Sequence, residues 1–100
     1  MKLYAIRRRN GWTCAESLGA TAEVSARVGN EEMPDRVRWI RSYVVREHDG
    51  ELGTICIYEA ADVDAIREHA LRVNMPADEI DEVIDTVVIR PDPVKAHATS

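Results

Sequence analysis

The pair Asp49-Gly50 constrains the fold of this chain more than any other feature, because it separates two strand-like runs. These runs, 37–47 and 53–59, are rich in valine, isoleucine and aromatic residues, which favour strands. Asp-Gly favours the type I′ turn that joins two antiparallel strands through a two-residue loop. The sequence therefore predicts a hairpin in the middle of the chain, with the register that a two-residue turn imposes.

Helical patterns flank this hairpin on both sides. Residues 13–16 have the T-x-x-E spacing of a capping box, which predicts a helix over 13–28 that ends at Gly29 in the left-handed conformation. After the hairpin, apolar residues recur at helical spacing. We expect Asp62 to cap the start of this second helix and Asn74 to end it.

Two further strands complete the pattern, one over 2–7 and one over 80–89. The order β-α-β-β-α-β is typical of the ferredoxin-like α+β fold, a four-stranded antiparallel sheet with two helices on one face. The other face of such a sheet is open. The domain is expected to span 1–89, followed by a polar, proline-interrupted flexible tail over 90–100.

Length and composition exclude several classes of protein. One hundred residues support a single domain with one core. The net charge of −5 argues against a nucleic-acid partner, and the basic run Arg7-Arg8-Arg9 is expected to be a solvated loop. No run reaches the roughly 20 apolar residues of a membrane span. Cys14 and Cys56 form no disulfide framework, so a reducing, cytoplasmic location is predicted.

The hairpin register predicts which residues share a face of the sheet. With a two-residue turn, Tyr43 pairs with Cys56 and Arg41 with Tyr58, so these four residues lie on one face. Trp39 follows the same alternation. We expect this set on the open face, because the alternate residues are more aliphatic. The residues expected to face the helices are Ile40, Ser42, Val44, Ile55 and Ile57.

An open face with a tryptophan and two tyrosines is predicted to be an interface or a ligand site. A second copy packed sheet against sheet would cover it, giving a homodimeric α+β barrel. A pocket between the sheets, lined by Arg41, Tyr43 and Tyr58, could bind an anionic or aromatic ligand through charge and stacking. The same residues could instead serve only to pack the dimer.

His69 and Glu59 are the candidates for metal binding or proton transfer. Glu59 ends a strand just before the helix that carries His69, and imidazole with carboxylate suits a divalent metal or a general base. The alternative is a structural pair that fixes the corner between strand and helix. Cys56 could likewise be a soft metal ligand or reactive thiol, or simply a small buried side chain.

Three stretches carry a resemblance to a known family: "VRWIRSYV" at 37–44, "CIYEAADVDAIREHA" at 56–70 and "MPADEIDEV" at 75–83. They resemble the DUF4242 family of small bacterial domains, mainly over 37–83. The resemblance implies a ferredoxin-like dimer. Some members are similar to actinobacterial nickel-binding proteins, which implies a role for a divalent transition metal such as nickel.

Three functions remain open at this point. The leading hypothesis is a non-catalytic homodimer that holds a small ligand or a metal near the sheet face or the corner between strand and helix. The second is a cofactor-free dimeric α+β barrel enzyme, such as a small monooxygenase or isomerase, which would need a pocket with a perturbed acid or base. The third is a purely structural interaction module, which would have the open face completely filled by its partner.

Overall fold

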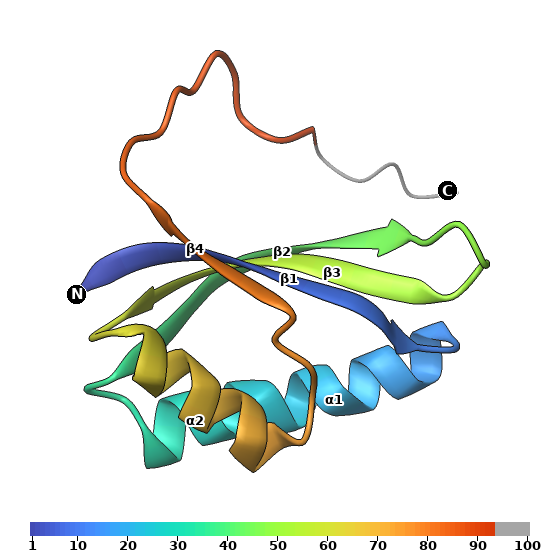
Figure 1. Cartoon of the computed structure of the whole chain (residues 1–100), viewed down its shortest axis with the longest axis horizontal. Helices are drawn as coiled ribbons and strands as arrows, with labels where there is room; N and C mark the ends of the chain where they lie inside the picture. Colours follow the sequence, from blue (N-terminus) through green and yellow to red (C-terminus); the bar gives the residue numbers. More distant parts are fainter. Residues whose placement is uncertain (94–100) are drawn as a thin grey trace.

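The computed structural model describes residues 1–93, which form a four-stranded antiparallel sheet with both helices on one face (Figure 1). Neither helix in this part of the chain has the length and apolar character needed to cross a membrane. The strand order is β2-β3-β1-β4, and it confirms the predicted ferredoxin-like fold. The elements are β1 (Lys2–Trp12), α1 (Ala15–Arg27), the π-helical turn η1 (Val28–Glu32), β2 (Val37–Arg46), β3 (Leu52–Ala60), α2 (Val63–Val73) and β4 (Glu79–Val83).

Helix α2 begins and ends as predicted. The side chain of Asp62 accepts a hydrogen bond of 2.8 Å from the backbone N–H of Ala65. Asn74 takes the left-handed conformation with a φ of 62°. Both residues satisfy backbone groups that a helix end would otherwise leave unpaired. One face of α2, with Ile66 and Val73 among its members, is buried against the sheet.

Helix α1 differs from the prediction at both ends. Its N-cap is Cys14, and no side chain caps it, so the predicted capping box does not form. At the other end the chain continues directly into η1, where the N–H of Met33 donates to the carbonyl of Val28 at 3.0 Å. Gly29 therefore lies inside a helical turn and does not adopt the left-handed stop that its position predicts.

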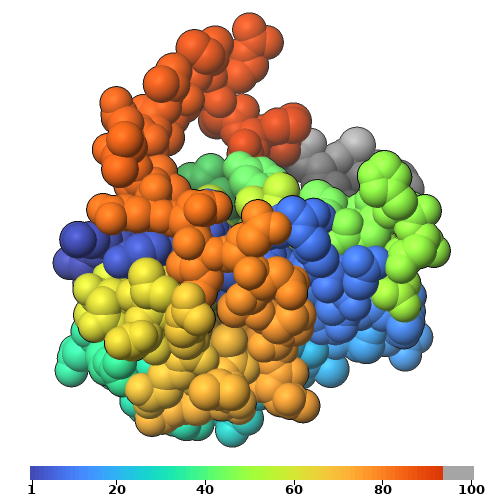
Figure 2. Space-filling view, viewed as in Figure 1, coloured from blue at the N-terminus to red at the C-terminus, as the bar shows by residue number. Residues whose placement is uncertain are grey.

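The last strand is shorter than predicted. Its partner β1 pairs from Leu3 with Val83, and β1 itself begins at Lys2, so no strand remains for the chain to pair with beyond Val83. Residues 84–92 instead leave the sheet edge and arch over the open face (Figure 1). In the space-filling view the middle of this segment stands clear of the body of the protein (Figure 2), while Asp92 at its end is hydrogen-bonded to Tyr43 of β2. Residues 94–100 of the predicted tail lie outside the described residues.

The hairpin loop has three residues, one more than the sequence predicts. The N–H of Glu47 donates to the carbonyl of Glu51 at 2.8 Å, and Gly50 has a positive φ of 89°. Three-residue hairpin loops typically place glycine in this conformation. The extra loop residue shifts the pairing by one, so Ser42 lies opposite Cys56. The predicted faces of β3 are therefore reversed.

A β-bulge in β2 changes the faces a second time. Trp39 pairs with Tyr58 and Arg41 pairs with Ile57, which leaves Ile40 as an extra residue on β2. Before the bulge, Trp39 turns toward the helices. After it, Ile40 and Arg41 both line the opposite face.

These two irregularities correct the predicted faces of the sheet. The inner face, which the helices cover, carries Trp39, Cys56 and Tyr58, three residues that the sequence placed on the open face. Arg41 and Tyr43 lie on the open face, as predicted. The open face is here defined by the outward residues of the four strands, which include Leu3, Ile40, Arg41, Tyr43, Ile55, Ile57, Glu59 and Val83.

The run Arg7-Arg8-Arg9 is part of β1 and is not the solvated loop that the sequence predicts. Tyr4 and Ile6 alternate into the core, and Arg8 continues the same alternation with only 1% of its surface exposed. The strand thus carries a cation to the inner face of the sheet.

Candidate functional site

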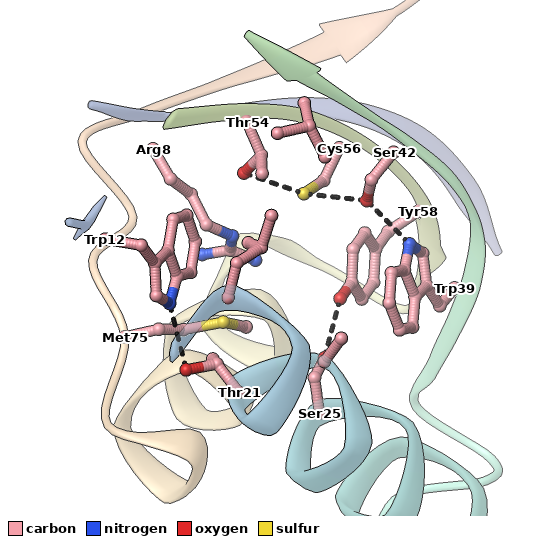
Figure 3. Close-up of a pocket in the computed structure, with 13 residues that line it drawn as sticks. Arg8, Trp12, Thr21, Ser25, Trp39, Ser42, Thr54, Cys56, Tyr58 and Met75 are labelled. Atoms are coloured by element: carbon pink, nitrogen blue, oxygen red, sulfur yellow. Dashed lines mark hydrogen bonds between the residues drawn. The ribbon is translucent and has the colours of Figure 1, made fainter. Parts of the chain in front are cut away.

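A pocket lies between the inner face of the sheet and helix α1 (Figure 3), and it is called the inner pocket below. Its volume is about 50 Å³. Arg8 enters it from β1, Trp39 from β2, and Cys56 and Tyr58 from β3. A cavity of this size can hold a few waters or a small ligand.

The pocket exists because the facing side chains are short. Helix α1 presents the small side chains of Ala22 and Ser25 to this space. On the sheet side, Ser42 and Thr54 are equally small. Close packing normally fills a protein interior. Here neither surface supplies the volume, so a hollow remains beside Arg8.

Arg8 is the most unusual residue of the site. Its Nη1 donates to the carbonyl of Pro76, while Nε and Nη2 are buried without a hydrogen-bond partner in the described part of the chain. Its guanidinium lies 5.9 Å from the centre of the Tyr58 ring, within the range of a cation–π contact. Figure 3 shows the guanidinium between Trp12 and Tyr58, pointing toward the middle of the pocket. A buried cation with unused donors is costly unless something pairs with it.

Tyr58 and Trp39 form one wall of the pocket. Their rings stack with centroids 6.1 Å apart and planes inclined by 9°. The hydroxyls of Tyr58 and Ser25 are joined by a hydrogen bond of 3.0 Å. Burial raises the pKa of Tyr58, opposed by the Ser25 hydrogen bond and by the charge of Arg8. The phenol is therefore neutral at ordinary pH and does not compensate the charge of Arg8.

A chain of hydrogen bonds crosses the sheet side of the pocket (Figure 3). Trp39 Nε1 donates to Ser42 Oγ at 2.8 Å, and Ser42 Oγ donates to Cys56 Sγ at 3.0 Å. Cys56 Sγ in turn donates to Thr54 Oγ1 at 3.2 Å. Cys56 is therefore a buried, hydrogen-bonded thiol, and its predicted role in ligand binding stays a prediction.

His69 is buried beneath Tyr58, with ring centroids 5.5 Å apart. Its Nε2 lies 3.1 Å from the carbonyl oxygen of Ser25, and a carbonyl can only accept, so Nε2 carries the proton. Nδ1 is buried without a partner in the described structure. Glu59 faces the opposite side of the sheet, where it pairs with Arg38 at 3.1 Å. The two predicted metal ligands therefore do not meet.

The described residues contain no group of three or more histidine, cysteine, aspartate or glutamate side chains that could hold a metal ion. His69 offers a metal only one nitrogen, Nδ1. The ring packs against Tyr58, which is in contact with the Arg8 cation. A metal site normally needs three or four ligands. The residues of one chain over 1–93 thus do not fit a nickel ion.

The free energy of unfolding is expected to fall as the pH drops below about 6.5, through His69. Burial lowers the pKa of His69, the charge of Arg8 adds to this shift, and the hydrogen bond to Ser25 opposes it. The unfolded chain therefore takes up a proton that the folded chain refuses. The loss is at most about 1.4 kcal/mol per pH unit between the unfolded and folded pKa values.

Urea unfolding of the wild type across this pH range measures the effect. The variant His69→Gln should lose this part of the pH dependence. The variant His48→Gln, changed in the exposed hairpin loop, should keep it. Parallel pH curves for the wild type and His69→Gln would show that His69 is not the source.

The open face carries a second group of candidate residues. Tyr43 OH donates to Asp92 at 2.8 Å, and Arg41 Nη1 lies 3.3 Å from the same carboxylate. Between this face and the arching segment 84–92 is a space of about 380 Å³, lined among others by Ile40 and Ile57. Arg41 and Tyr43 are thus close together, but Tyr58, their predicted companion, lies on the other side of the sheet.

Sequence reasoning missed Arg8 and Trp12 as pocket residues. The signal for Arg8 was present in the alternation of Tyr4, Ile6 and Arg8 along one strand. The arginine run suggested a loop and hid that alternation. Trp12, whose Nε1 donates to Thr21 Oγ1 at 2.9 Å, carried no such signal.

The fold and site define a small ferredoxin-like α+β domain with a small pocket between its sheet and helices and an opposite face that no helix covers. Within that class, the chain belongs to the family of nickel responsive proteins described as SCO4226-like, whose sequence profile matches residues 4–83. The predicted link to nickel-related proteins is confirmed at this level, and the DUF4242 label stays a prediction.

A solved structure agrees with this fold. The chain is similar to the crystal structure of SCO4226 from Streptomyces coelicolor A3(2), with a TM-score of 0.66 and 16% sequence identity. The match covers 85% of this chain and 99% of that one. At this identity the likeness supports the fold. No curated protein matches the sequence.

Proposed function

We propose that this protein is a non-enzymatic homodimeric binding protein related to the nickel response of its family, with a small ligand in the inner pocket. The observation that carries the proposal is Arg8, a buried guanidinium whose Nε and Nη2 have no partner in the described structure and which lines a cavity. A buried cation without a partner is energetically costly, so we expect this pocket to bind a molecule that pairs with it.

The dimer part of the proposal rests on the open face. Ile40 and Tyr43 are 43% and 41% exposed there, and Ile55 and Ile57 extend the same surface. The apolar residues of segment 84–92, such as Val88, are largely exposed as well. Apolar surface of this extent marks an interaction site. A second copy brings an identical face and segment, so sheet-against-sheet packing is self-complementary.

Nickel enters the proposal through the family alone. Because residues 1–93 of one chain supply no set of three ligands, direct binding of Ni²⁺ would require further ligands, for example from the second copy. We therefore treat nickel as a signal or a cargo of the protein and do not place it in the inner pocket.

An enzymatic function has less support. Arg8, Cys56 and Tyr58 line the inner pocket, but none of its lining residues is a histidine, aspartate or glutamate. These are the usual general acids and bases.

A cytoplasmic location is part of the proposal, because Cys14 and Cys56 are both free, as in proteins of reducing compartments.

Native mass spectrometry of the purified protein tests the proposal. We expect the mass of two chains together with a small molecule that is released on denaturation. Calorimetric titration with NiCl₂, before and after that release, tests the nickel part. A monomer with no bound species and no heat of nickel binding would contradict the proposed function.

A further inference from the structure

We propose that the inner pocket binds a small carboxylate with an apolar remainder, held by the free edge of the Arg8 guanidinium. This inference rests on the proposed function, because it names the class of ligand that the pocket takes.

The charge of Arg8 indicates that the ligand is an anion. Arg8 forms no ion pair among residues 1–93, and the pocket lining contains no carboxylate. Its neighbour Arg7 is paired with Glu47 at 2.8 Å, and Arg9 is paired with Glu79 at 2.7 Å. Of the three successive arginines, the buried one alone lacks an anionic partner among the residues that the structure describes. A ligand that enters this pocket gains most by bringing a negative charge.

The geometry of the free donors of Arg8 fits a carboxylate. Nε and Nη2 lie along one edge of the planar guanidinium, and their N–H bonds point in nearly the same direction. This edge matches the two oxygens of a carboxylate in a bidentate pair. The opposite corner is already fixed, because Nη1 donates to the carbonyl of Pro76. That bond and the Tyr58 ring hold the guanidinium in place, so little ordering is needed on binding.

The rest of the pocket lining indicates that the remainder of the ligand is apolar. Beyond Arg8 the pocket presents apolar surface from Trp12, Leu18 and Val44, and the hydroxyl groups that also line it are already hydrogen-bonded within the protein. The Trp39 ring, which is 36% exposed, stands at the outer side of the pocket. The cavity of about 50 Å³ accommodates a carboxylate and a short carbon chain. A longer or aromatic remainder would extend outward past Trp39. The arrangement favours a monocarboxylate over a multiply charged or sugar-like molecule.

Thermal unfolding with added sodium propionate tests the inference, and propionamide is the neutral control of the same shape. We expect saturating propionate to raise the Tm of the wild type by at least about 4 °C, while propionamide leaves it unchanged. Arg8→Met should weaken propionate binding about ten- to a hundredfold. The matched variant Arg9→Met removes the neighbouring, surface-paired arginine and should bind as the wild type does.

Nuclear magnetic resonance of the wild type keeps the test independent of how Arg8→Met folds. We expect one arginine Nε–H signal to shift and saturate with propionate. An equal response to propionamide, full binding by Arg8→Met, or tighter binding of inorganic phosphate than of propionate would overturn the inference. If native mass spectrometry still shows a dimer with a different bound molecule, only the carboxylate assignment falls and the proposed function stands.

Discussion

Replacing Ile66 with alanine is expected to lower the free energy of unfolding by about 2–5 kcal/mol. Ile66 is 1% exposed and belongs to the core cluster between α2 and the sheet. Its truncation removes buried apolar surface and leaves a cavity that a close-packed interior closes only in part. Urea unfolding followed by circular dichroism measures the change.

Leu71 provides the matched control on the same helix. It is 81% exposed, so Leu71→Ala should change the free energy of unfolding by less than about 0.5 kcal/mol. Equal losses for Ile66→Ala and Leu71→Ala would mean that α2 does not bury the face described.

Replacing Ile40 with glutamate is expected to separate the proposed dimer into monomers. Ile40 lies at the bulge of β2, on the open face that a second copy would cover. A carboxylate buried there without a partner costs several kcal/mol, which weakens association at least about a hundredfold. Sedimentation velocity over a range of protein concentrations measures the dissociation constant.

Leu71→Glu makes the same chemical change on the helix side of the molecule. Since that side is away from the open face, this variant should remain dimeric (Figure 1). A wild-type dimer that survives Ile40→Glu unchanged would place the interface elsewhere.

The fold could be predicted because most of its signals are local. The cap at Asp62 and the left-handed Asn74 depend on a few neighbouring residues, and both are found as expected. The order of strands and helices follows from periodicity together with turn and cap signals. The short β4 was missed because its end depends on where β1 begins, and that is a property of the pairing partner.

The faces of the hairpin were harder to predict, because a register error of one residue moves every side chain of a strand to the other face. A third loop residue before Glu51 reversed all of β3, and Ile40 then shifted the first part of β2. Neither event changes the composition of the strands. Trp39 and Tyr58 consequently moved from the expected outer surface to the inner pocket.

The site was predicted only in part for the same reason. Arg41 and Tyr43 lie where the alternation placed them, but Glu59 and His69 are separated by the sheet that the register determines. Arg8 was overlooked because a triple arginine is normally solvated, and its burial depends on the volume missing from α1.

Strand β2 lines both candidate sites, because successive residues of a strand point to opposite faces of the sheet. Trp39 lines the inner pocket and the next residue lines the open face, with Cα atoms about 3.8 Å apart. A ligand that displaces Trp39 would therefore shift Ile40. Under the proposals above, ligand binding and subunit association are linked equilibria, and each changes the affinity of the other by the same factor. The amount of ligand in the cell would then help to set how much of the protein is assembled.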